Sequence, residues 1–153
     1  MRRRRPYTQS LLLYAYQDSA RRLTAELNAA GHPAIRPKHG AVFANLDEEG
    51  TRATTLAERA AMGKAAMGEL IDELERLGYV TRRPDPTDRR AKLIVPTQAA
   101  LDVTQLVHEF NQRLERQLRR RLGAETYRSL RRSLELLGGR AAAQPRIGPS
   151  KKR

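Results

Sequence analysis

A chain of 153 residues is long enough to bury a hydrophobic core without disulfide or metal staples. It contains no cysteine, which excludes disulfides, thiolate metal sites and thiol redox chemistry. The formal net charge is +13, but the terminal segments 1–5 and 139–153 hold nine of the basic residues and no acidic one. The rest of the chain has 21 basic and 17 acidic residues. Charge alone therefore does not identify a nucleic-acid binder, because basic tails are also common solubilising ends.

Several classes of protein find no support in the sequence. No apolar run approaches the roughly 18 residues that a membrane helix needs, and the basic start has no small-residue cleavage site after it. The chain also lacks an HExxH pair, a Gly-rich phosphate loop and a nucleophile elbow. We therefore expect a cytoplasmic protein with no membrane partner, no enzymatic activity and no metal or cofactor.

The first third of the chain predicts one long helix and one short one. Apolar residues from Leu12 to Leu27 recur at steps of three and four, which indicates a helix over about 8–30 that ends at Gly31. A second helical stretch is expected over 37–46, before the acidic turn 47–50.

The next segment has the pattern of a helix-turn-helix. Thr54 or Thr55 can cap a short helix, and Gly63 opens a second one after a turn of three or four residues. The second helix carries apolar residues at helical spacing, namely Met67, Leu70, Ile71, Leu74 and Leu77. Because such residues face a core, we expect them to shape the helix and not to read DNA bases.

A β-hairpin with a basic tip follows this motif. Its strands are predicted at 79–84 and 91–95, with a charged turn between them. The hairpin carries Arg82, Arg83, Arg89, Arg90 and Lys92 against Asp85 and Asp88. A wing that lies along a phosphate backbone needs such an excess of positive charge.

Two further apolar stripes, separated by Gly123, predict helices over about 97–138. A winged helix needs neither these helices nor the one at 8–30, so we interpret them as a dimer interface, with a larger monomeric helical domain as the alternative. The predicted organisation is a basic tail at 1–7, one domain at 8–138 whose winged helix-turn-helix spans about 51–96, and a basic disordered tail at 139–153.

The segment 56–95, LAERAAMGKAAMGELIDELERLGYVTRRPDPTDRRAKLIV, closely resembles the MarR family of bacterial regulators. DPTDRRAKL, residues 85–93, is its most specific part, and the likeness extends from about Thr8 to Gly138. It implies a mainly α fold with a small β-hairpin wing, a winged helix-turn-helix between dimerisation helices, and binding to double-stranded DNA as a homodimer. It further implies that Arg90 enters the minor groove while Asp88 holds its guanidinium.

The start of the predicted recognition helix departs from the family pattern. Where the family offers Ser or Thr, Lys, Gln and Thr or Ala, this chain has Gly63, Lys64, Ala65 and Ala66. Side-chain hydrogen-bonding groups are scarce there, so we expect weak direct readout and salt-sensitive affinity. Glu69 either accepts from cytosine or, as we favour, pairs with an arginine such as Arg90. The predicted DNA-binding residues are Arg52, Gly63, Lys64, Ala65, Ala66, Gly68, Arg82, Arg83, Asp88, Arg89, Arg90 and Lys92.

The resemblance also implies a pocket for a small aromatic effector. Aromatic rings beside histidine or arginine could hold an aromatic carboxylate, and the candidates are Tyr14, Tyr16, His32, Arg36, His39 and Phe43. The arginine run 113–132 is interpreted as a solvated helix face, or else as a wider DNA footprint. The predicted function is a dimeric transcription repressor relieved by an aromatic ligand. The alternative is a sequence-tolerant DNA-coating or protein-binding winged-helix dimer.

Overall fold

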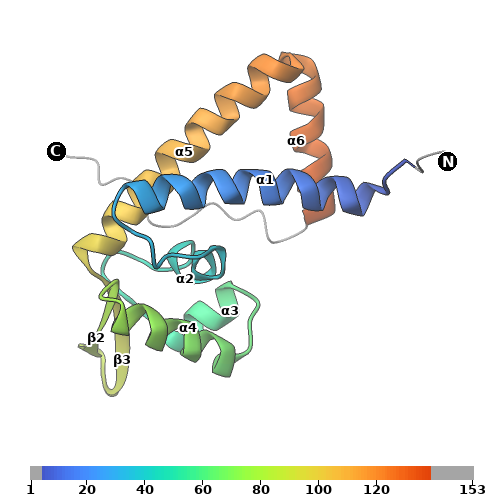
Figure 1. Ribbon diagram of the computed structural model, residues 1–153. Helices are drawn as coiled ribbons and strands as arrows, with labels where there is room; N and C mark the ends of the chain where they lie inside the picture. Colours follow the sequence, from blue (N-terminus) through green and yellow to red (C-terminus); the bar gives the residue numbers. More distant parts are fainter. Residues whose placement is uncertain (1–4, 139–153) are drawn as a thin grey trace. The chain divides into compact units, whose positions relative to one another are not determined.

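The structure, a computed structural model, describes residues 5–138 and divides into two compact units (Figure 1). The first unit, up to Pro37, consists of helix α1, Thr8–Ala29, and the loop after it. At the end of α1, the amides of Gly31 and His32 donate to the carbonyls of Asn28 and Leu27. This pattern stops the helix where the sequence predicts its end. Most of the tail at 1–7 and all of the tail at 139–153 lie outside the described residues.

The second unit begins at Lys38 and contains all the remaining elements. In chain order these are η1 (Pro37–His39, whose first residue closes the first unit), α2 (Gly40–Phe43), β1 (Thr51–Arg52), α3 (Ala53–Arg59), α4 (Lys64–Arg76), β2 (Val80–Asp85), β3 (Asp88–Pro96), α5 (Gln98–Leu122) and α6 (Ala124–Gly138). This mainly helical architecture with a small antiparallel sheet confirms the predicted winged-helix fold. The helix expected over 37–46 is only a 3₁₀ turn followed by the short α2.

Helix α4 forms because its apolar residues share one face. Met67, Leu70, Ile71 and Leu74 follow the spacing i, i+3, i+4, i+7, and all four are buried. Contacts with α2, α3 and β2 surround the helix. Burial of one such side chain contributes about 1.5–3 kcal/mol, so this stripe fixes α4 against its neighbours. We call the part of the second unit formed by α2 to α4 and β1 to β3 the lobe. The expectation that these residues are structural is confirmed.

The short helix α3 begins earlier than predicted. It starts at Ala53 with Arg52 at the N-cap, so Thr54 and Thr55 lie inside the helix and do not cap it. At its end, the amides of Ala61 and Met62 donate to the carbonyls of Glu58 and Ala57. Ala61 has φ of +51°, the left-handed conformation that glycine usually supplies in this motif. The turn to α4 is thus built without glycine at its most demanding position.

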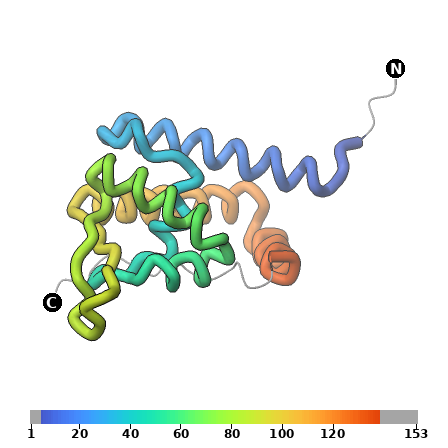
Figure 2. The backbone as a smooth tube through the Cα atoms, turned by 90° about the horizontal axis from the view of Figure 1, so that it is seen from below, coloured from blue at the N-terminus to red at the C-terminus, as the bar shows by residue number. Residues whose placement is uncertain are grey.

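The three strands form one antiparallel sheet in the order β1-β3-β2. Thr51 and Arg82 both pair with Ile94, so β3 is the central strand. The short β1 had no counterpart in the sequence prediction. Gly50 precedes β1 with φ of +105°, and a Cβ there would lie 2.9 Å from Val95 Cγ2. Figures 1 and 2 both show the β2–β3 hairpin extending beyond the neighbouring helices.

The last two helices differ from the rest of the unit in burial. The start of α5 is anchored to the lobe, because the Thr97 hydroxyl donates to the carbonyl of Gly78 and the Thr97 amide to that of Tyr79. Ala100, Val103 and Phe110 of α5 are buried, whereas α6 buries no residue. The break between them falls at Gly123, as predicted. Among residues 5–138, no helix combines the length and apolar character needed to span a bilayer.

Candidate nucleic-acid interface

Exposed cations gather on the hairpin and at the start of α4. Arg83, Arg89, Arg90 and Lys92 are exposed on the two long strands, and Lys64 is exposed in the first turn of α4. None of these five side chains forms a hydrogen bond or ion pair with another described residue. Five unpaired cations are available for an anionic partner without breaking an existing contact.

The Asp85 carboxylate holds the turn of the hairpin. Sequence analysis considered Asp85 only for its negative charge. Asp85 is 6% exposed, and its Oδ1 accepts from the Thr87 amide at 2.8 Å and the Thr87 hydroxyl at 2.7 Å. The Arg52 guanidinium lies 2.6 Å from Asp85 Oδ2. These Thr87 hydrogen bonds, followed by Arg52, lower the pKa of Asp85 to about 2. The charged pair ties β1 to the hairpin and fixes the direction of its tip.

This arrangement changes the predicted role of Arg52. Its guanidinium also lies 3.7 Å from Asp88 Oδ2, so Arg52 is shared between two hairpin carboxylates. It therefore holds the wing in place and is not a free phosphate donor. The signal that could have found this contact is the spacing of Asp85 and Thr87, since an aspartate often accepts from the amide two residues on.

The predicted contact between Asp88 and the Arg90 guanidinium is absent from the described residues. Asp88 Oδ1 instead accepts from the backbone amide of Arg90 at 3.0 Å. The favoured pairing of Glu69 is also not observed, since Glu69 is exposed and makes no ion pair with a described residue. For Asp88 the reason is that a local bond from carboxylate to amide costs less side-chain entropy than holding a long arginine.

Arg82 is likewise committed inside the protein. Its guanidinium forms ion pairs with Asp72, at 2.5 Å, and with Glu75, both on α4. Only 28% of the Arg82 side chain is exposed. The prediction that Arg82 binds DNA is therefore replaced by a structural role, because two carboxylates already compensate its charge. Arg82 fixes the hairpin against the C-terminal half of α4.

The start of α4 has the plain surface that its sequence suggests. Gly63 is the N-cap and offers no side-chain bond, and the helix begins at Lys64. Ala65 and Ala66 are exposed, and Gly68 is half-buried one turn further along. Lys64 is therefore the one long donor in the first turn. Methyl groups can contact thymine, but they cannot form a hydrogen bond with a base edge.

Comparisons with known proteins find a family model and relatives that are similar to part of this chain. Residues 35–91 match the model of the MarR family, which covers the helix-turn-helix and most of the hairpin. The HTH-type transcriptional regulator YcgE of Bacillus subtilis is 39% identical over 56 residues, 36% of this chain and 36% of YcgE. The match thus spans about a third of that relative's length.

Solved structures extend the likeness to nearly the whole chain. Streptococcus pneumoniae FabT in complex with DNA superposes with a TM-score of 0.75 over 85% of this chain and 92% of FabT, at 14% identity. The Staphylococcus aureus MepR–DNA complex gives 0.70 over 87% of this chain and 97% of MepR, at 16% identity. The MarR family model therefore matches the helix-turn-helix and most of the hairpin of this chain, and the solved structures share its fold. At these identities the structures establish the shared fold, including α1, α5 and α6, which the family model leaves out.

The residues predicted to form the effector pocket belong to both units, and each unit is described by itself. His39 and Phe43 are buried in the second unit, where Phe43 packs edge-on against Tyr79 with ring centroids 6.2 Å apart. His39 Nε2 lies 3.4 Å from Glu73 Oε1, and Lys38 Nζ lies 2.5 Å from Glu73 Oε2. The Lys38 hydrogen bond lowers the pKa of Glu73. His39 and Phe43 are therefore core residues of the lobe.

The remaining candidates belong to the first unit and are scattered there. Tyr14 and Tyr16 are both exposed on α1, but a spacing of two residues places them on different sides of the helix. The Arg36 guanidinium donates to the carbonyls of Pro33 and Ile35 and so closes its own loop. His32 lies half-buried in the same loop. Of the six candidates, Tyr16 lines the cavity described next.

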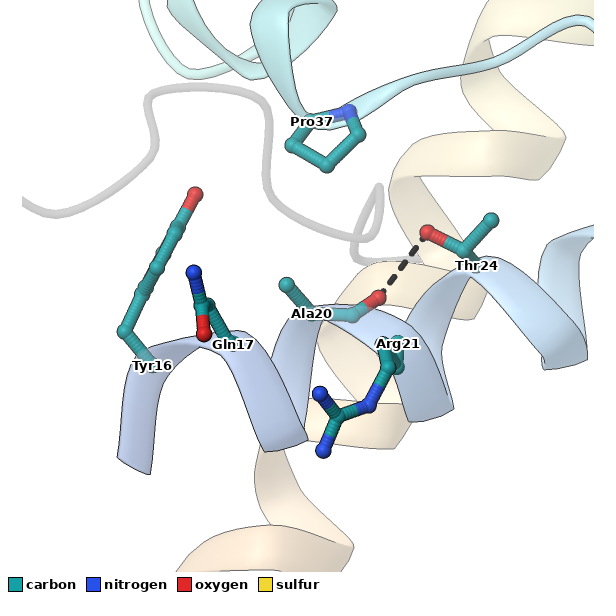
Figure 3. A pocket seen from close by; sticks show the side chains of 6 residues that line it. All are labelled: Tyr16, Gln17, Ala20, Arg21, Thr24 and Pro37. Atoms are coloured by element: carbon teal, nitrogen blue, oxygen red, sulfur yellow. Dashed lines mark hydrogen bonds between the residues drawn. The ribbon is translucent and has the colours of Figure 1, made fainter. Parts of the chain in front are cut away.

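That cavity lies along α1 (Figure 3). It has a volume of about 540 Å³, is open to solvent, and is lined by Tyr16, Gln17, Ala20, Arg21, Thr24 and Pro37. The Thr24 hydroxyl donates to the carbonyl of Ala20 at 2.9 Å, and Arg21 pairs with Asp18 at 3.1 Å. The polar groups at this hollow are thus partly satisfied by α1 itself.

Proposed function

We propose that this protein is a homodimeric, DNA-binding transcription regulator that contacts the duplex with the start of α4 and the β2–β3 hairpin. The observation that carries the proposal is the set of unpaired cations defined above, which stand on a hairpin braced from two sides. Asp85 and Arg52 hold its tip, and Arg82 holds its flank. Because the brace uses other residues, Arg89 and Arg90 keep their full charge for phosphates or the minor groove.

Dimer formation is supported by leucines that the described part of the chain leaves uncovered. Leu130, Leu134, Leu136 and Leu137 of α6 are 38–80% exposed. Tyr7, Leu11, Leu12 and Leu13 at the start of α1 are likewise exposed. A soluble monomer rarely exposes apolar groups in such clusters. A second copy that covers them would place two reading lobes on one duplex.

The test is fluorescence anisotropy of the purified protein on DNA from its own upstream region and on scrambled DNA, over a range of salt. Arg90→Ala should weaken binding by about 1–3 kcal/mol. Arg76→Ala removes an equal charge from an exposed residue at the other end of α4 and serves as the control. Equal affinities of the Arg90 variant and the wild type on upstream DNA would contradict the proposed role of the hairpin.

The same titration separates a specific regulator from a sequence-tolerant DNA-coating protein. Lys64, Ala65 and Ala66 give α4 few base-reading groups, so affinity should fall steeply with salt. Preference for upstream over scrambled DNA at physiological salt supports the regulator. Equal loss of both DNAs as salt rises supports the coating function, which the bare start of α4 favours.

The finer part of the proposal is repression that a small aromatic ligand relieves. The Tyr16 ring and the Arg21 guanidinium at the hollow of α1 could receive an aromatic carboxylate. Benzoate at millimolar concentration should then release upstream DNA from the wild type but not from Tyr16→Ala. Release from both proteins, or from neither, would reject this ligand site and leave the DNA-binding proposal unaffected.

A further inference from the structure

A second cluster of cations lies far from the hairpin, where α5 meets α6. Arg116, Arg119 and Arg120 are exposed near the end of α5, and Arg128 and Arg132 are exposed on α6. None of the five forms a hydrogen bond or ion pair with another described residue. These five residues, which we call the corner arginines, have no part in the interface proposed above.

An ion pair fixes how the two helices are turned toward each other. Arg131 Nη1 of α6 lies 2.8 Å from Glu115 Oε2 of α5, which raises the pKa of Arg131. Arg119 lies one turn from Glu115 toward the corner, and Arg128 lies one turn from Arg131 in the same direction. Arg119 and Arg128 therefore share one edge of the α5–α6 pair.

Four of the corner arginines point away from the apolar faces of their helices. On α5, Arg116 and Arg120 lie on the side opposite Leu114 and Leu118, which are half-buried. On α6, helical spacing places Arg128 and Arg132 opposite Leu130 and Leu134. A partner copy that covers Leu130 and Leu134 would leave these arginines in solvent, because Leu136 alone of the exposed leucines lies on their side of α6.

The corner is out of reach of a duplex bound at the hairpin. Helix α5 starts directly after β3 and has 25 residues, a length of about 37 Å. Figure 1 shows the α5–α6 corner at the far end of α5 from the β2–β3 hairpin, and the hairpin tip points the other way. The corner arginines thus need an anion of their own.

We propose that the corner arginines bind the phosphate backbone of a second DNA duplex, so that one protein dimer bridges two DNA segments. The proposal rests on the DNA-binding function proposed for α4 and the hairpin. The guanidinium suits phosphate because its fork of donors can bind two oxygens at once. The surface between the arginines is polar, with Gln112 and Gln117 among the neighbours. A protein partner would need several apolar anchors, whereas Leu136, one turn from Arg132, is the one exposed leucine on this side of the described α6.

The experiment is a two-duplex capture. Upstream DNA is fixed to beads and loaded with protein, excess protein is washed away, and a labelled unrelated duplex is added at about 100 mM salt. The variant R116Q/R120Q/R128Q/R132Q should capture the second duplex about tenfold less than the wild type and bind the first duplex within about twofold. Arg76→Gln removes one exposed charge away from the corner and is the control for the single variant R120Q, and equal melting curves confirm that the exposed substitutions leave the fold intact.

Three results would overturn the bridge. Equal capture by the quadruple variant means that the two reading lobes hold separate duplexes. Loss of first-duplex affinity in that variant means that the arginines belong to a single footprint. Retention of a labelled polyglutamate peptide but no second duplex points to an acidic protein partner. If no protein loads on the upstream DNA, both proposals fail, because a sequence-independent phosphate site would also bind that duplex. If Arg90→Ala protein loads as well as the wild type and only the quadruple variant fails to load, the hairpin proposal fails and the corner is the DNA site.

Discussion

The lobe and helix α6 differ in how much of their apolar surface is buried. In the lobe, Leu46, Leu56, Met67, Ile71 and Leu74 are fully buried or nearly so. Helix α6 has a comparable apolar stripe, yet none of its residues is buried. The same helical pattern therefore occurs in α4, whose apolar face packs within its own chain, and in α6, whose apolar face is left uncovered by the described residues. We infer that the lobe carries its own stability, whereas α6 depends on a second copy.

The sharpest test of the lobe's independence is Leu74→Ala. Leu74 has no exposed surface, so its truncation leaves a cavity and should cost about 2–5 kcal/mol of unfolding free energy. Urea unfolding, at one protein concentration for all variants, measures the loss. Leu77→Ala at the C-cap of α4 removes the same atoms from a side chain that is 37% exposed, and its effect should be much smaller. Equal losses at the two positions would mean that the lobe lacks a packed core.

The opposite test concerns α6, where Leu130→Gln with Leu134→Gln should dissociate the dimer and leave the lobe folded. Each leucine that a partner buries contributes about 1.5–3 kcal/mol, so the dimer Kd should rise by about a hundredfold or more. Analytical ultracentrifugation measures the Kd. Glu125→Gln, on an exposed residue at the start of α6, is the matched control. A wild-type protein that is monomeric throughout the range would show that α6 is covered by something other than a second copy.

Features that depend on residues close in the sequence could be predicted, whereas contacts between residues far apart in the sequence could not. The apolar stripe of α4, its opening at Gly63 and the break at Gly123 depend on neighbouring residues, and all were predicted. The pairs of Arg52 with Asp85 and of Arg82 with Asp72 join different elements, and sequence analysis predicted both arginines to bind DNA. A charged residue looks the same in a sequence whether its partner is a phosphate or a distant carboxylate.

The brace between Arg52 and Asp85 predicts a pH dependence within the lobe. The folded-state pKa of Asp85, about 2, is below its ordinary value of 3.8. Its contribution to stability is therefore present above the ordinary pKa and is lost as the pH falls from about 4 to 2. The difference in stability between wild type and Asp85→Asn should shrink across that window, as measured by urea unfolding. Thr87→Val removes the largest cause of the shift and should raise the pKa of Asp85, which carboxyl-carbon NMR can follow.

A matched control for this pH effect is Glu48→Gln. Glu48 is exposed and makes no ion pair with a described residue, so its neutralisation should leave the difference from wild type small across the same window. A stability difference for Asp85→Asn that is constant from pH 5 to about 2 would show that the carboxylate is not ionised in the brace.

The smallest expected effect lies inside the lobe, at the turn between α3 and α4. Ala61 is held at φ of +51°, where a Cβ costs about 1 kcal/mol that glycine does not pay. Ala61→Gly should raise the unfolding free energy by less than that, because glycine also gains freedom in the unfolded chain. Ala60→Gly is the control, since Ala60 has an ordinary helical φ of −81° and should be destabilised. If both substitutions destabilise equally, the turn relaxes in solution, and the angle between α3 and α4 is set by the buried face of α4 instead.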